Sequence, residues 1–227
     1  TFVELCEEEL ERIAEHCDSL TAIVGSPVAG EEGTVSAAVV IERGQITRRI
    51  AKQYVDYRDE MGYIHPSTGT EVITVAGEQV AVVVGNDLVR VRDCDQSVTT
   101  IININARRFR KRVLEARYEK FPHIAFVEGK NLVFVNHVGG STDMVYDGTS
   151  SVYDSKGELV LLLETFNEDF KVCDLGVQNE PIATPFSYYQ NRTRNLYDAI
   201  KCGLKDYFEK NGYEKAEEIK AVLINQE

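Results

Sequence analysis

The segment 80–84 of this chain reads VAVVV, and it limits the possible folds more than any other feature. Successive side chains of a strand point to opposite faces of its sheet, so a strand that is apolar at every position needs cover on both faces. Residues 98–104 predict a second buried strand of the same kind. We therefore expect a layered α/β protein whose central strands are covered on both sides.

Strand and helix patterns alternate along the rest of the chain. Residues 2–17 carry apolar side chains on one helical stripe and glutamates opposite, which predicts an amphipathic helix. Glycine-containing turns such as Arg43-Gly44 separate short β-branched runs, a pattern typical of hairpins. We expect helices at 2–17, 107–120 and Arg192–Asn211, and strands at 21–25, 35–41, 46–50, 71–75, 79–84, 98–104, 123–127, 131–135, 145–153, 158–164 and 169–173.

The simplest division of the chain is one domain and an extension. We predict a domain over residues 1–177, followed over 178–227 by a proline-containing connector and a C-terminal linker helix. The 227 residues show no internal repeat, and a chain of this length can bury a sizeable core without disulfides or metals.

Charge and hydropathy exclude several classes of function. A net charge of -12 disfavours nucleic-acid binding, and no apolar run approaches the roughly 20 residues that span a bilayer. The cysteines are odd in number and scattered, which indicates neither a disulfide framework nor a zinc site, and the four histidines lack ligand spacing. We expect a cytoplasmic protein with reduced thiols, no metal and no cofactor. The cysteines are Cys6, Cys17, Cys94, Cys173 and Cys202.

Several segments occur in an order that is typical of one family. They are KQYVDY at 52–57, IININA at 101–106, LVFVNHVGG at 132–140, VYDGTS at 145–150 and the helix that begins NLYDAI at 195. Together they resemble the nitrilase (carbon–nitrogen hydrolase) superfamily, and more specifically the glutaminase domain of glutamine-dependent NAD synthetases. The resemblance covers most of residues 1–215. It implies an α/β fold, the nitrilase-like α-β-β-α sandwich, here without the family's first strand.

The resemblance also implies a Glu–Lys–Cys triad, usually joined by a second glutamate. In that chemistry the thiol attacks the amide carbon of glutamine, the first glutamate transfers the proton and the lysine stabilises the oxyanion. Lys52 matches the lysine, and Glu60 in the pair Asp59-Glu60 matches the second carboxylate. Tyr57 matches the family's tyrosine and is a candidate for substrate binding.

The family's nucleophile is absent from its expected place. The segment GNDLV at 85–89 stands where the family has C-E-D-L-W, so Gly85 occupies the nucleophile position and cannot attack. Asn86 and Asp87 beside it remain candidates for substrate binding. The nearest thiol, Cys94, lies in a polar run among carboxylates, which disfavour the thiolate, and it needs a large rearrangement to reach Lys52.

Other positions also depart from the family pattern. The first catalytic glutamate lies in the family on a strand before the opening helix, and that strand is missing; Glu4 is expected on a solvated helix face. The family's S-A-S-P-F is NARRF here, so Arg107 and Arg108 either bind an anionic ligand or begin a helix. No glycine-rich ATP pyrophosphatase loop follows the last helix, which argues against ATP binding.

Three functions are compatible with these residues. The first is a glutaminase-type domain without catalysis that acts as a structural or regulatory module. The second is an active carbon–nitrogen hydrolase that releases ammonia from glutamine for NAD synthesis through a displaced Cys94 nucleophile. The third is a small-anion binding module built on Arg107 and Arg108. The resemblance further implies a homo-oligomer and a synthetase domain or subunit as partner.

Overall fold

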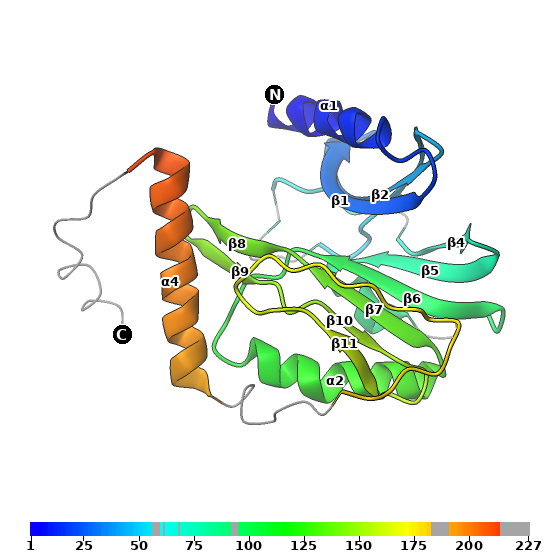
Figure 1. Ribbon diagram of the computed structural model, residues 1–227. Coiled ribbons are helices and arrows are strands. Elements are labelled where there is room, and N and C mark those ends of the chain that lie inside the picture. Colours follow the sequence, from blue (N-terminus) through cyan, green and yellow to red (C-terminus); the bar gives the residue numbers. More distant parts are fainter. Residues whose placement is uncertain (56–59, 61, 68, 92–94, 183–190, 214–227) are drawn as a thin grey trace.

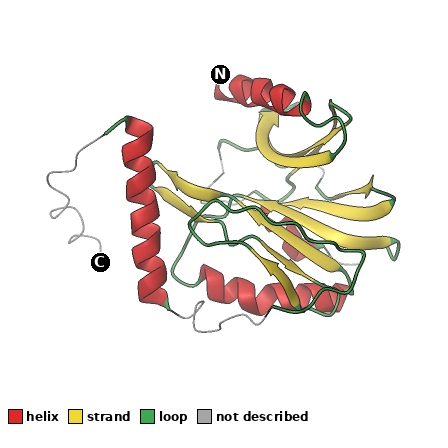
Figure 2. Cartoon of the chain, viewed as in Figure 1, coloured by secondary structure: helices red, strands yellow, loops and turns green. Residues whose placement is uncertain are grey.

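The computed structural model describes residues 1–55, 60, 62–67, 69–91, 95–182 and 191–213. Its core consists of four layers, namely a helix, a small sheet, a large sheet and a second helix (Figure 1). Figure 2 shows the helices on the outer sides and the strands between them. The expected α-β-β-α layering is therefore confirmed. Among the described residues, no helix is long and apolar enough to cross a membrane.

The small sheet carries the N-terminal helix on its outer face. Its strands are antiparallel in the order β1-β2-β3. They are β1 (Thr21–Ala29), β2 (Thr34–Glu42) and β3 (Gln45–Ala51). Helix α1 (Phe2–Ala14) begins with a capping box in which the Thr1 hydroxyl accepts from the Glu4 amide and the Glu4 carboxylate accepts from the Thr1 ammonium. Glu4 is exposed there, as predicted.

The large sheet has six strands in the order β11-β10-β7-β6-β5-β4. Its central strands β5, β6 and β7 are parallel, and the remaining pairs are antiparallel. Helix α2 (Val113–Glu128) covers the outer face. The strands are β4 (Glu71–Val75), β5 (Glu78–Val84), β6 (Val98–Asn105), β7 (Asn131–Asn136), β10 (Ser151–Tyr153) and β11 (Leu159–Leu162).

Successive side chains of the central strands pack into different layers. In β2, Val39 packs in the cluster beneath α1, whereas Val40 packs between the two sheets. In β5, Val82 faces the small sheet, and Val83 faces the layer that contains Phe121 of α2. This alternation explains why the segment VAVVV is apolar at every position.

A hairpin and the last helix form a unit beside the sandwich. The hairpin joins β8 (Val138–Ser141) to β9 (Met144–Asp147), and α4 (Arg192–Asn211) packs against it. The Asp206 carboxylate accepts a hydrogen bond from the Gly140 amide. The face of α4 turned inward carries Asn195, Ala199 and Cys202, while Leu196 is 56% exposed.

Two of the expected strands are not found, and the helix expected at 107–120 lies further along the chain, at Val113–Glu128. Helix α2 begins at Val113 and continues through Pro122 to Glu128, so the predicted strand at 123–127 is wrong. Phe121 and Ala125, one helical turn apart, pack together on the large sheet, which favours the helix. The predicted strand at 169–173 is also wrong: these residues form no strand, and the Asp169 carboxylate accepts a hydrogen bond from the Glu164 amide.

Candidate functional site

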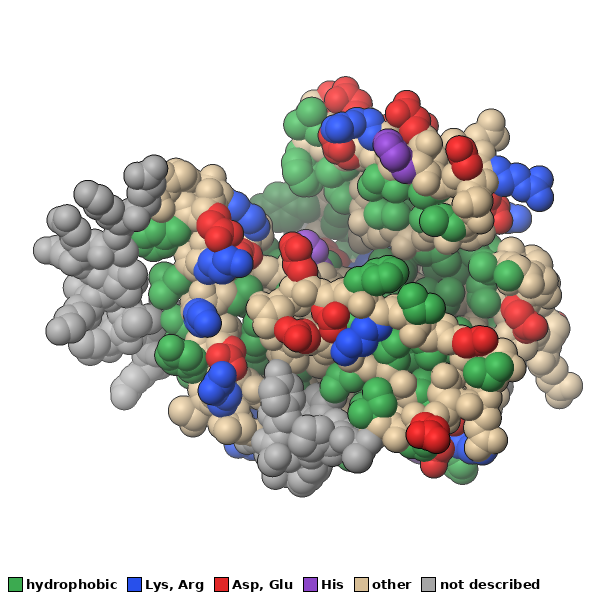
Figure 3. Space-filling view, viewed as in Figure 1, with side chains coloured by type: hydrophobic (Ala, Val, Ile, Leu, Met, Phe, Trp, Pro, Cys, Tyr) green, Lys and Arg blue, Asp and Glu red, His purple; other side chains and the backbone are tan. Residues whose placement is uncertain are grey.

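A cavity of about 520 Å³ opens where the ends of the two sheets meet. Figure 3 shows the molecule hollowed between the part that carries α1 and the part beneath it. Because β5, β6 and β7 are parallel, their carboxyl ends lie at one edge, which forms one wall of the cavity. The polar residues that line it, given together with Gly85, are Ser26, Ser36, Lys52, Glu60, Gly85, Asn86, Asn105, Arg107, Arg108, Arg110, Asn136, His137 and Tyr146.

Lys52 and Glu60 form a buried ion pair in this cavity. The Lys52 ammonium Nζ lies 2.6 Å from each Glu60 carboxylate oxygen. The two side chains are 6% and 24% exposed. Lys52 directly follows β3, and its backbone amide donates to the Ser36 carbonyl of β2. This hydrogen bond fixes the backbone from which the side chain enters the cavity. The lysine and the carboxylate singled out in the sequence therefore lie together.

Gly85 lies against Lys52 at the end of β5. Its φ angle is +58°, in the left-handed region that favours glycine. A Cβ atom at this position would be 3.0 Å from Nζ and 2.9 Å from Cε of Lys52. A side chain on residue 85 would therefore start in contact with the ammonium group.

Asn103 holds the Gly85 turn from the neighbouring strand, and sequence reasoning did not single it out. It is fully buried in β6, and its side-chain amide donates to the carbonyls of Val83 (3.3 Å) and Gly85 (3.0 Å). A buried amide without partners is costly. The signal in the sequence was therefore an asparagine in the middle of an otherwise buried strand.

The two arginines enter the cavity from the segment that follows β6. The Arg107 guanidinium donates to the Asn86 side-chain oxygen at 2.9 Å, and the Arg107 backbone amide donates to the Asn136 side-chain oxygen at 2.8 Å. The backbone of Arg108 pairs with that of Tyr146 in β9 as an isolated antiparallel β-bridge. Because α2 begins only at Val113, the expectation that these arginines begin the helix is wrong.

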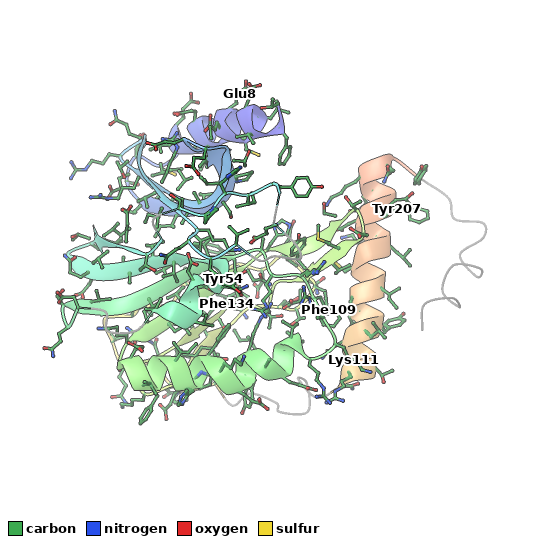
Figure 4. The ribbon with its side chains drawn as sticks, turned by 180° about the vertical axis from the view of Figure 1, so that it is seen from behind. Glu8, Tyr54, Phe109, Lys111, Phe134 and Tyr207 are labelled. Atoms are coloured by element: carbon green, nitrogen blue, oxygen red, sulfur yellow. The ribbon has the colours of Figure 1, made fainter. Side chains whose placement is uncertain are left out.

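Asp87 has a positioning role that differs from the substrate contact expected of it. Its side chain is nearly fully buried, and Asp87 does not line the cavity. Its carboxylate oxygens accept from the backbone amides of Gln53 and Tyr54, each at 2.7 Å. Asp87 belongs to the short 3-10 helix η1 (Gly85–Arg90), so it ties this turn to the segment that follows Lys52. Figure 4 labels Tyr54 near the junction of the two sheets.

Two candidate residues, Tyr57 and Cys94, lie outside the described residues. The thiols that the structure describes belong to other parts of the fold, and none of them lines the cavity. Within the described part of the chain, no group of three or more His, Cys, Asp or Glu side chains is arranged to hold a metal ion.

Comparison with known proteins identifies the fold and the relatives. No protein-family model matches the chain. A glutamine-dependent NAD+ synthetase from Xanthomonas campestris pv. campestris is 28% identical over 94% of this chain and 41% of the relative. Another from Synechocystis sp. is 26% identical over 95% of this chain and 44% of the relative. The chain thus spans less than half the length of these relatives.

Solved structures show which fold the chain has. A glutamine-dependent NAD+ synthetase from Acinetobacter baumannii superposes with a TM-score of 0.76 at 21% identity, over 92% of this chain and 42% of the other. An amidase of the nitrilase superfamily from Nesterenkonia superposes with a TM-score of 0.62 at 20% identity, over 86% of this chain and 73% of the other. This chain has the nitrilase fold and is related to glutamine-dependent NAD+ synthetases.

In this nitrilase-fold chain a histidine stands at the rim of the cavity. The His137 ring packs edge-on against Tyr146, with centroids 4.7 Å apart, and its backbone amide donates to the Asn105 carbonyl. Partial burial, and then the nearby Lys210, hold the pKa of His137 below its usual value. The imidazole is therefore neutral near pH 7 and can donate or accept a hydrogen bond at the rim.

Proposed function

We propose that this chain is a glutaminase-type nitrilase-fold domain that does not hydrolyse glutamine, and that it acts as a structural or regulatory module. The observation that carries the proposal is Gly85. Attack on an amide carbon needs a nucleophile, and a thiolate is stabilised beside a cation. The position that faces the Lys52 ammonium carries no side chain.

The arginines that line the cavity support this proposal. The resemblance assigns small side chains to the segment after β6, where a glutamine substrate would need room. Here Arg107, Arg108 and Arg110 line the cavity. We also propose further copies of the chain and a synthetase domain or subunit as partners. The greater length of the relatives supports the second of these.

Ammonia release from glutamine tests the proposal. We expect the chain to release ammonia at the background rate, and we expect the same rate from Lys52→Ala and from the control Lys201→Ala. Lys201 is exposed on α4, so this control removes the same charge far from the site. Turnover well above background that Lys52→Ala abolishes and Lys201→Ala leaves intact would contradict the proposal.

A second measurement, mass spectrometry, tests the alternative of a displaced Cys94 nucleophile. We expect mass spectrometry to find no adduct on Cys94 after exposure to an electrophilic glutamine analogue. An adduct on Cys94, together with turnover that Cys94→Ala removes, would replace our proposal by the active hydrolase. Turnover with an unmodified Cys94 would contradict both.

A second candidate function is the binding of a small anion in the same cavity. Three arginines line it, and Glu60 is the one carboxylate among its described lining residues. We expect small carboxylates or inorganic phosphate at millimolar concentration to raise the melting temperature, because a ligand that binds only the native state stabilises it. We expect Arg108→Gln to remove the shift. An unchanged melting temperature would contradict this function.

A further inference from the structure

A second cavity, of about 410 Å³, lies on the other side of the Gly85-Asn86 turn. This volume is within the range of small-molecule sites, roughly 300–1,000 Å³. One face of α2 forms its wall, with Val113, Ala116, Lys120, Phe121 and Ile124 at helical spacing. Leu88 and Val89 of η1 form an apolar surface opposite. The cavity therefore offers an apolar slot that is independent of Lys52.

The charged residues among the described lining of this cavity are all cationic. Six of its described lining residues are Lys or Arg, and none is Asp or Glu, in a chain whose net charge is -12. Arg117 is neutralised by Asp147. By contrast, Lys111 and Lys120 have no carboxylate in ion-pair range among the described residues. Clustered cations around a low-dielectric slot attract anions. The six are Arg107, Arg110, Lys111, Arg112, Arg117 and Lys120.

The beginning of α2 adds to the positive potential at one end of the slot. Arg112 is the N-cap residue, and its side chain makes no capping hydrogen bond. No side-chain cap therefore compensates the positive end of the dipole of this 16-residue helix, and Glu115, the acid of its first turn, is already paired with Arg192. Val113 and Ala116 of that turn line the cavity. Figure 4 shows Lys111 at this end of α2.

We propose that this second cavity binds an organic phosphate with an apolar or aromatic body. Its phosphate group lies against the segment 110–112 and the first turn of α2, where a dianion gains more than a monoanion from several cations. Its apolar body lies along α2, over Phe121 and Ile124 and opposite Val89. The site goes beyond the proposed function, because Lys52 does not line it, although Gly85 and Asn86 line both cavities.

Isothermal titration calorimetry with 1-naphthyl phosphate tests the site, with inorganic phosphate and 1-naphthol as partial ligands. We expect naphthyl phosphate to bind at least tenfold more tightly than either, because each partial ligand lacks one of the two matching surfaces. Equal affinity for inorganic phosphate would overturn the apolar half of the proposal. Equal affinity for naphthol would overturn the anionic half, and absence of binding at millimolar concentration would overturn both.

Three variants locate the ligand. We expect the double variant Lys111→Ala/Arg112→Ala to weaken binding at least tenfold, because it removes two cations from the phosphate end. We expect Ala116→Leu, which fills the slot without changing charge, to weaken it as much. The control Lys156→Ala/Lys201→Ala removes two exposed charges elsewhere and should change the affinity less than twofold.

Circular dichroism and urea unfolding of each variant separate loss of the site from loss of the fold. Binding that survives in folded Ala116→Leu would overturn the placement in the slot. An equal loss in the control would show that only the net charge matters, which would also overturn the proposal. Glutamine hydrolysis is measured separately, so a failure of this site leaves the proposed function unaffected.

Discussion

Asp147→Asn is expected to destabilise the fold by about 3–5 kcal/mol, the usual cost of leaving one buried charge without its partner. Asp147 is fully buried at the end of β9, and its carboxylate binds the Arg117 guanidinium of α2 through contacts of 2.5 and 3.2 Å. Arg117 is 6% exposed and stands 4.8 Å from the Phe134 ring centroid. The guanidinium is therefore left largely desolvated and without its partner when the carboxylate is lost.

Urea unfolding measures this cost against an exposed ion pair. Asp198→Asn breaks the pair with Arg194 within α4, and we expect it to cost less than about 1 kcal/mol. Burial raises the pKa of Asp147, and Arg117 opposes that rise. The double variant Arg117→Met/Asp147→Leu, which removes both charges, should be less destabilised than Asp147→Asn. Equal costs for Asp147→Asn and Asp198→Asn would contradict a structural role for the buried pair.

The order of the layers could be predicted from the sequence, because a strand that is buried on both faces must be apolar at successive positions. Val82 and Val83 are neighbours in the chain and belong to different layers, so both must be apolar. A hydrophobic pattern of this kind is local, so it can be recognised without knowing which strands pair with it. The same reasoning failed at 123–127, where Ile124 and Val127 suit a strand, because contacts of α2 with the large sheet decide the conformation.

The candidate site was only partly predictable for a different reason. Lys52 and Gly85 could be paired through a family pattern, and they lie side by side. The buried side chain of Asp87 binds backbone amides more than thirty positions earlier in the sequence, and Asn103 binds the carbonyl of Gly85 in the turn after another strand. No spacing rule connects such residues, because their partners are set by tertiary structure.

Gly85→Ala is expected to destabilise the fold by about 2–5 kcal/mol, through two separate causes. The first is the left-handed backbone, with φ at +58°, which costs a residue with a Cβ about 1–2 kcal/mol. The second is the contact with Lys52, whose Cε would lie 2.9 Å from the new atom, and overpacking typically adds about 1–3 kcal/mol. Glu60 holds the ammonium, so Lys52 cannot move away freely.

A double-mutant cycle separates these causes. Gly77→Ala is the control, since Gly77 also has a positive φ angle, +88°, but nothing lies within 4 Å of its Cβ position. In the Lys52→Ala background the cost of Gly85→Ala should fall to that of Gly77→Ala, because the contact is gone and only the backbone cost remains. If Gly85→Ala costs the same in both backgrounds, residue 85 does not face the ammonium. The proposal of a vacated nucleophile position beside Lys52 would then lose its geometric basis.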